Sequence, residues 1–108
     1  MNMTIESIFS LTSSGAVLAG YLEAGNLKVG QDILVKTKNN SIKTKIEGIE
    51  INKESVSAAK AGQHLAIMAS NIDFDLLSDG VLHTEDGLYI PENLKVIEAP
   101  KKWWNIFS

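Results

Sequence analysis

The chain has 108 residues, of which 44% are hydrophobic and 21% are charged, and its formal net charge is −3. This length suits a single domain, and the composition excludes an intrinsically disordered chain. The chain contains no cysteine, which excludes disulfides and thiolate metal sites, and we expect a cytoplasmic protein. No apolar run is long enough to span a membrane, and polar residues interrupt the first eleven positions, so we expect no signal peptide.

The apolar residues alternate or form short β-branched runs, which predicts strands rather than helices. In the first strand, Ile5, Phe9 and Leu11 share one face. The turn Asn39-Asn40-Ser41 predicts a hairpin, because asparagine tolerates the left-handed conformation of tight turns. We predict strands at residues 5–11, 16–23, 33–35, 42–51, 65–69, 81–83, 88–90 and 94–97.

The long strand over residues 42–51 changes the phase of its apolar alternation at Gly48, which predicts a β-bulge. The only helical candidate is a single turn at residues 73–78. The fold class is therefore all-β, and closure into a barrel would remove the exposed strand edges. We expect one barrel domain over residues 1–99, with these residues in its core: Val17, Ile33, Val35, Ile46, Leu65 and Ile67.

Glycines recur at positions 20, 25 and 30, and the last two have the spacing of a phosphate-binding loop. Such a loop needs lysine and then serine or threonine after its second glycine, whereas Gln31 and Asp32 follow here. We therefore expect no nucleotide and no other cofactor. The structural interpretation is that Gly25 and Gly30 form tight turns, while Gly20 allows another strand to approach closely.

No catalytic or metal site is recognisable in the sequence. His64 and His83 lie in separate predicted strands without a suitably spaced set of ligands. The acidic residues Asp73, Asp75 and Asp79 lack the glycine and terminal glutamate of a calcium loop. No serine lies in a nucleophile elbow or near a recognisable base. We therefore predict a non-enzymatic protein.

The C-terminal segment, residues 100–108, reads Pro-Lys-Lys-Trp-Trp-Asn-Ile-Phe-Ser and holds both tryptophans of the chain. Aromatic rings beside lysines suit a lipid headgroup region, a groove on a partner protein or a stacked base. The alternative is that this segment folds back over the barrel. We predict that Trp103, Trp104 and Phe107 form a contact surface for a partner, a membrane or a second copy of the chain.

Several short motifs resemble domain 2 of elongation factor Tu and related translational GTPases. They are Phe9, Gly15-x-Val17-x-x-Gly20, Gly25-x-Leu27-x-Val29-Gly30-x-x-Ile33, Gly48-Ile49-Glu50 and Ala61-Gly62-Gln63. The resemblance covers about residues 5–84. It implies a closed or nearly closed Greek-key β-barrel that stands without the GTP-hydrolysing domain, so no GTPase activity is implied.

In elongation factor Tu this barrel helps to hold the aminoacylated 3′ end of tRNA, and in the wider family it faces the ribosome. The resemblance places Glu50 and Gln63 at the family's 3′-end pocket. All ten basic residues of this chain are lysine, so contacts to RNA would rest on point charges rather than on planar guanidinium groups. The candidate RNA contacts cluster around the predicted hairpin: Lys28, Lys36, Lys38, Lys43 and Lys45.

The function predicted first is a binding module for an unknown protein partner. An RNA- or ribosome-binding protein is the first alternative, and steep loss of binding with salt would distinguish it. A membrane-surface or assembly adaptor that acts through the aromatic segment is the second alternative, and liposome flotation would distinguish it.

Overall fold

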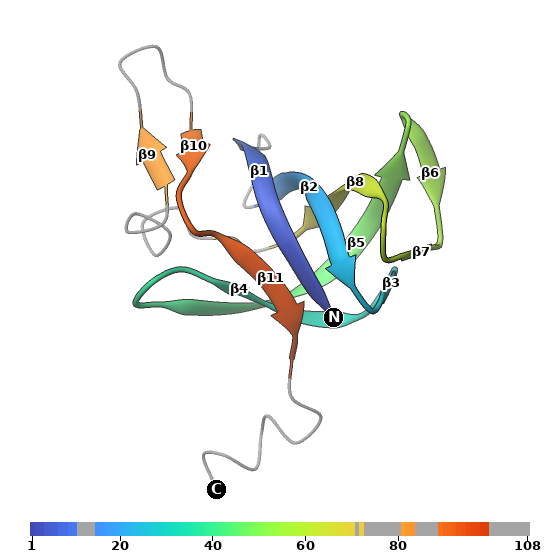
Figure 1. The fold of residues 1–108 in the computed structure, drawn as a ribbon, viewed down its shortest axis with the longest axis horizontal. Helices are drawn as coiled ribbons and strands as arrows, with labels where there is room; N and C mark the ends of the chain where they lie inside the picture. The colour runs from blue at the N-terminus through green and yellow to red at the C-terminus, as the bar shows by residue number, and fades with distance from the viewer. Residues whose placement is uncertain (11–14, 71, 73–80, 84–88, 100–108) are drawn as a thin grey trace, which may run out of the picture.

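The computed structural model describes residues 1–10, 15–70, 72, 81–83 and 89–99, and every secondary-structure element among them is a β-strand. Figure 1 shows their arrangement. The strands are β1 (Asn2–Ser10), β2 (Ala16–Ala24), β3 (Asn26–Lys28), β4 (Asp32–Lys36), β5 (Ser41–Ile51), β6 (Glu54–Val56), β7 (Ala58–Lys60), β8 (His64–Ala69), β9 (Val81–His83), β10 (Tyr89–Pro91) and β11 (Lys95–Glu98). The prediction of an all-β fold is confirmed.

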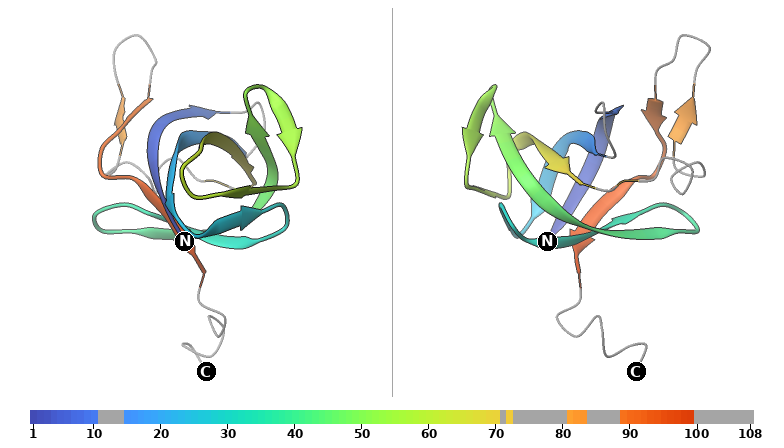
Figure 2. Two further views of the ribbon diagram at one scale, coloured as in Figure 1. Left: turned by 45° about the vertical axis from the view of Figure 1, so that its right-hand side comes forward. Right: turned by 180° about the vertical axis from the view of Figure 1, so that it is seen from behind.

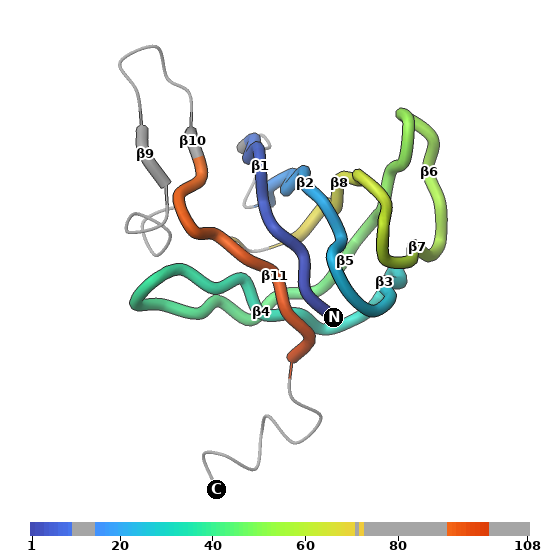
Figure 3. The backbone as a smooth tube through the Cα atoms, viewed as in Figure 1, coloured from blue at the N-terminus to red at the C-terminus, as the bar shows by residue number. Residues whose placement is uncertain are grey.

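Six strands form a closed antiparallel ring in the order β4, β11, β1, β2, β8 and β5. The ring closes because β4 pairs with β11 on one edge and with β5 on the other. Figure 2 shows the ring from two further directions, and the tube in Figure 3 follows the path of the chain around it. Strand β6 adds to β5, while β3 pairs with β7 and β9 pairs with β10 outside the ring.

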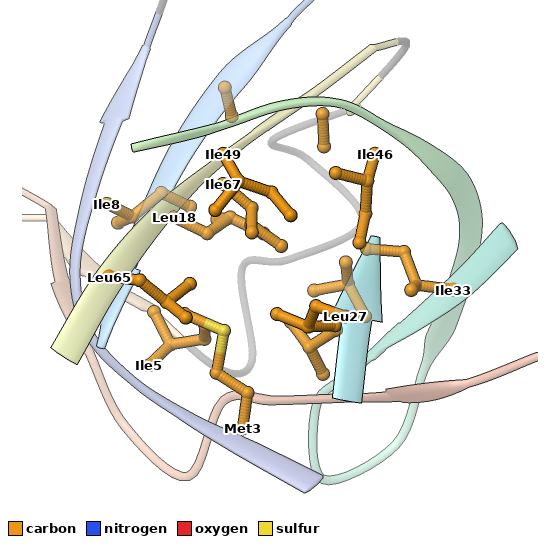
Figure 4. Packing of buried hydrophobic residues seen from close by; sticks show 14 of the residues in the cluster. Met3, Ile5, Ile8, Leu18, Leu27, Ile33, Ile46, Ile49, Leu65 and Ile67 are labelled. Atoms are coloured by element: carbon orange, nitrogen blue, oxygen red, sulfur yellow. The ribbon is translucent and has the colours of Figure 1, made fainter. Parts of the chain in front are cut away.

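The interior of the ring is filled by aliphatic side chains that alternate along the strands. On β2, Leu18 and Leu22 are buried, and Figure 4 shows Leu18 packing among Ile49 and Ile67. Five of the six predicted core residues are buried: Ile33, Val35, Ile46, Leu65 and Ile67. The prediction for Val17 is wrong, because the two-residue period of β2 turns Leu18 inward and leaves Val17 on the outer face.

A β-bulge in β1 changes which side chains face the core. Ile5 pairs with Gly20 and Ser7 pairs with Ala19, so Glu6 is the extra residue. Beyond the bulge Ile8 points inward, whereas Phe9 is 56% exposed. The prediction that Ile5 and Phe9 share one face is therefore wrong, because an inserted residue reverses the alternation of a strand. Leu11, predicted to share that face, lies outside the described residues.

The bulge predicted in β5 is confirmed, since the register with β8 shifts between Ile46 and Gly48. Both isoleucines that flank it, Ile46 and Ile49, are buried although they are three residues apart. The hairpin predicted at residues 39–41 is also confirmed, with β4 and β5 as its two strands. The left-handed conformation expected of its asparagines is not found, because neither Asn39 nor Asn40 has a positive φ.

Two turns of the same design close one end of the barrel. Their sequences are Lys28-Val29-Gly30-Gln31 and Lys60-Ala61-Gly62-Gln63. In each turn the glutamine Oε1 accepts the backbone N–H of the lysine at 3.1 Å, and the glycine has a positive φ, 91° or 94°. Strands β3 and β7 lead into these turns and pair with each other. This pairing places Leu27 beside Ala59, and both side chains are buried.

The backbone N–H groups of the first turn already donate hydrogen bonds to carbonyl oxygens of the barrel. Val29 N–H donates to Ser57, Gly30 N–H to Ile46, and Gln31 N–H to the carbonyl of Lys28. A phosphate-binding loop instead directs its amides at the anion. Gly25 and Gly30 thus lie in the turns at the two ends of β3, each with a positive φ, as predicted.

Gly20 lies at a close approach of β2 to β1, and a Cβ atom there would fall on the backbone carbonyl of Thr4. We expect Gly20→Ala to lower the free energy of unfolding by about 3 kcal/mol, because backbone atoms cannot rotate away as a side chain can. Gly30→Ala is the matched control: its Cβ would meet nothing within 4 Å, so only the positive φ is penalised, by about 1 kcal/mol. Urea unfolding followed by circular dichroism measures both, and equal losses would contradict the close approach at Gly20.

Candidate nucleic-acid interface

The outer face of the β4–β5 hairpin carries three of the five lysines predicted to contact RNA. Ile33 and Val35 of β4 point into the barrel, so Lys36 lies on the outside. On β5 the buried residues Ile42 and Ile46 alternate with the exposed Lys43 and Lys45 in the same way. Figure 1 shows this hairpin extending past β11, beyond the ring.

Strand β11 adds a lysine that the sequence analysis missed. Lys95 pairs with Lys36 across the β11–β4 ladder, and both side chains are exposed. Directly opposed side chains on one face of an antiparallel pair lie about 5 Å apart at their Cβ atoms. Only the pairing of the last strand with the fourth brings these two lysines together, and no local pattern in the sequence indicates it.

The turn at the hairpin tip is held by Thr37, which is buried. Its Oγ1 accepts the N–H of Asn40 at 2.8 Å and that of Asn39 at 3.3 Å, and its backbone N–H donates to the carbonyl of Asn40. The exposed Lys38 is therefore carried on an ordered turn. We name Lys36, Lys38, Lys43, Lys45 and Lys95 the lysine face.

No carboxylate of the described residues lies within salt-bridge distance of any lysine in this face. Leu34, between Lys43 and Ile97 on the same outer surface, is buried and apolar. Like charges directly opposed on a sheet destabilise it. The Lys36–Lys95 pair consequently lowers the stability of the sheet locally, and a bound polyanion would neutralise this repulsion.

A depression of about 370 Å³ borders the lysine face. Lys43 and Lys45 line one side of it, and Asp32, Thr44, Glu47 and Ser70 complete the lining. The Ser70 Oγ donates to Glu47 Oε1 at 3.0 Å, and the Thr44 hydroxyl donates to the Ser70 carbonyl. The carboxylates of Asp32 and Glu47 therefore form the edge of the lysine face at this depression.

Lys28 does not join the other four predicted lysines in the β4–β5 hairpin. It lies on β3, at the barrel end closed by the two matching turns. The exposed Lys60 lies diagonally across the β3–β7 ladder from it. The structure therefore places the predicted lysines on two surfaces.

The two predicted pocket residues occupy separate places. Glu50 on β5 pairs with Ala66 of β8, whereas Gln63 precedes β8 by one residue, about 10 Å along the chain from Ala66. The Gln63 side chain accepts the N–H of Lys60, and its carbonyl accepts the N–H of Leu22. Gln63 thus has a structural role in the turn.

The described residues contain no group of three or more His, Cys, Asp or Glu side chains that could hold a metal ion. His64 is exposed, and its Nε2 lies 3.5 Å from Glu6 Oε1, beside the ring of Tyr21. The acidic set at Asp73, Asp75 and Asp79, the predicted helical turn at 73–78, and Trp103, Trp104 and Phe107 lie outside the described residues, as does the side chain of His83.

Comparison with solved structures identifies the type of barrel. Translation elongation factor SelB from Methanococcus maripaludis, in its apo form, superposes with a TM-score of 0.68 at 24% sequence identity, over 88% of this chain and 18% of the SelB chain. SelB in complex with the GTP analogue GppNHp gives the same values. The barrel has the translation-factor domain 2 fold. No family model matches the sequence.

The domain 2 fold confirms what the short motifs implied about architecture. This chain spans 18% of the length of the SelB chains, so the comparison concerns one barrel within a much longer protein. At this level of identity the likeness establishes the fold.

Within the described part of the chain, no helix has the length and apolar character needed to cross a membrane.

The Lys36–Lys95 pair leads to a stability prediction. We expect Lys95→Gln to raise the free energy of unfolding by about 0.2–1 kcal/mol at low salt, because it removes a like-charge cross-strand pair. The gain should shrink at high salt, which screens exposed charges. Lys53→Gln, in the turn between β5 and β6, is the charge-matched control. Thermal unfolding at two salt concentrations measures the effect, and a loss of stability in Lys95→Gln would contradict the interpretation.

Proposed function

We propose that this protein is a non-enzymatic, cytoplasmic, translation-related module that binds RNA through the lysine face. The observation that carries the proposal is the concentration of exposed lysines on one side of a chain whose net charge is −3, where no carboxylate of the described residues pairs with them. Lys36, Lys43 and Lys95 come from three adjacent strands of one rigid sheet. The likeness to a translation elongation factor supports RNA as the polyanion.

The lysine face suits contacts to the phosphate backbone rather than to base edges. Lysine ammonium groups act as point charges without directional preference, so they neutralise phosphates in any sequence. Double-stranded RNA is recognised mostly by its shape and by contacts to phosphates and 2′-hydroxyl groups across its shallow minor groove, which an exposed lysine face on a projecting hairpin can reach. We therefore infer recognition of folded RNA by shape and charge, with little sequence specificity.

The protein partner that the sequence favoured stays a prediction, since its proposed contacts lie outside the described residues. The same holds for a membrane partner. The opposed lysines Lys36 and Lys95 favour RNA over a protein partner and over a membrane surface. An RNA backbone supplies negative phosphate charges at regular spacing along its length.

The test is binding of a fluorescently labelled RNA hairpin over a range of salt concentrations. We expect binding to weaken steeply with salt, as counterion release requires. The double variant Lys36→Gln/Lys43→Gln should bind more weakly and reduce the slope of log K against log salt by about 1.5, since each phosphate contact contributes about 0.7–0.9.

The control is Lys53→Gln/Lys60→Gln, which removes the same charge from the β5–β6 turn and from β7. This variant should retain both the affinity and the slope. Equal losses in the two double variants would show that only net charge matters, and absence of salt-dependent binding in the wild type would refute the proposal.

A further inference from the structure

The side of the barrel opposite the lysine face has a different chemistry. In the ring, β2 lies directly across from β4, and β1 and β8 flank it. Cross-strand pairing places outward-facing residues of these three strands in rows. One row is Phe9, Val17 and Met68, and the next is Ser7, Ala19 and Ala66. We name the outer surface of β1, β2 and β8 the lysine-free face.

The lysine-free face is apolar and has an exposed aromatic ring. Phe9 is 56% exposed, and Val17, Ala19, Ala66 and Met68 are partly exposed around it. Tyr21 extends this surface along β2, where it pairs with Thr4 of β1. Exposed aromatic and methionine side chains with few lysines are the composition of a protein contact surface.

The charges of this face are negative. Strands β1, β2 and β8 contain two glutamates, Glu6 and Glu23, and no lysine. Glu6 is the bulged residue of β1, and its side chain is 56% exposed beside His64. Glu23 is also exposed and accepts the hydroxyl of Thr4 at 2.6 Å. A complementary occupant therefore combines apolar rings with lysines or arginines.

We propose that the occupant is the chain's own C-terminal segment, with Trp103, Trp104 and Phe107 on the apolar surface and Lys101 and Lys102 toward the glutamates. This segment alone combines adjacent aromatic residues with adjacent lysines in the sequence. Its composition complements the lysine-free face in both polarity and charge. The inference is independent of RNA binding by the lysine face.

The length of the segment permits this contact within one molecule. Tyr21 is level with Lys95 of β11, because both pair with Thr4 of β1, which lies between them. Two strand spacings across the sheet and three residues along β11 therefore separate Tyr21 from Glu98, a distance of about 14 Å. Trp103 follows Glu98 by five residues, a reach of about 17 Å, and Phe107 by nine residues, about 30 Å. A short connection also gives the segment a high effective concentration at its own barrel, which favours this source over a second copy.

Tryptophan fluorescence of the full-length protein tests the proposal, because both tryptophans lie in the segment. We expect a blue-shifted emission and weaker acrylamide quenching than in a synthetic peptide of residues 101–108. The substitution Phe9→Ser, or Ala19→Lys as a second variant, should shift both readings toward those of the peptide. Lys101→Glu/Lys102→Glu should do the same.

Lys43→Gln on the opposite face is the control and should leave the emission unchanged, while far-UV circular dichroism verifies that each variant is folded. Wild-type emission equal to that of the peptide would overturn the proposal. So would emission unaffected by Phe9→Ser and Ala19→Lys, which would place the tryptophans elsewhere. Emission that changes with protein concentration would identify a second copy as the occupant and would also overturn it.

Discussion

Pairing along both edges of β4 closes the barrel, and both proposed surfaces depend on it. A six-strand sheet left open between β4 and β5 would expose two rows of unpaired backbone groups and the aliphatic core. Closure satisfies these backbone groups and encloses Ile33, Ile46 and Ile67. The same closure places β11 beside β4, so the opposed lysines Lys36 and Lys95 arise from the interaction that completes the fold.

Two bulges set which side chains the barrel presents to solvent. The bulge at Glu6 turns Phe9 outward on β1, and the irregularity at Gly48 keeps Ile46 and Ile49 inside along the bent β5. Gly20 permits the close contact of β1 with β2 beside the first bulge. The exposed aromatic ring of the lysine-free face is thus a consequence of backbone geometry in β1.

The lysines of the six ring strands all lie on one half of the ring. The lysine face lies on β11, β4 and β5, while β1, β2 and β8 carry carboxylates and apolar side chains. These are the two surfaces proposed to bind a polyanion and the basic aromatic C-terminal segment. The domain 2-type barrel therefore presents two surfaces of different chemistry on opposite sides of one ring.

The sequence by itself determined the elements whose causes are local. Alternating apolar residues located eight of the described strands but missed the three-residue strands β3, β6 and β7. The segment 39–41 located the hairpin, and the phase change at Gly48 located a bulge. The tertiary structure alone decided the outward position of Phe9 and the pairing of Lys95 with Lys36. Which residues become neighbours across strands depends on pairings between distant segments, and one inserted residue such as Glu6 reverses the faces of all that follow in the strand.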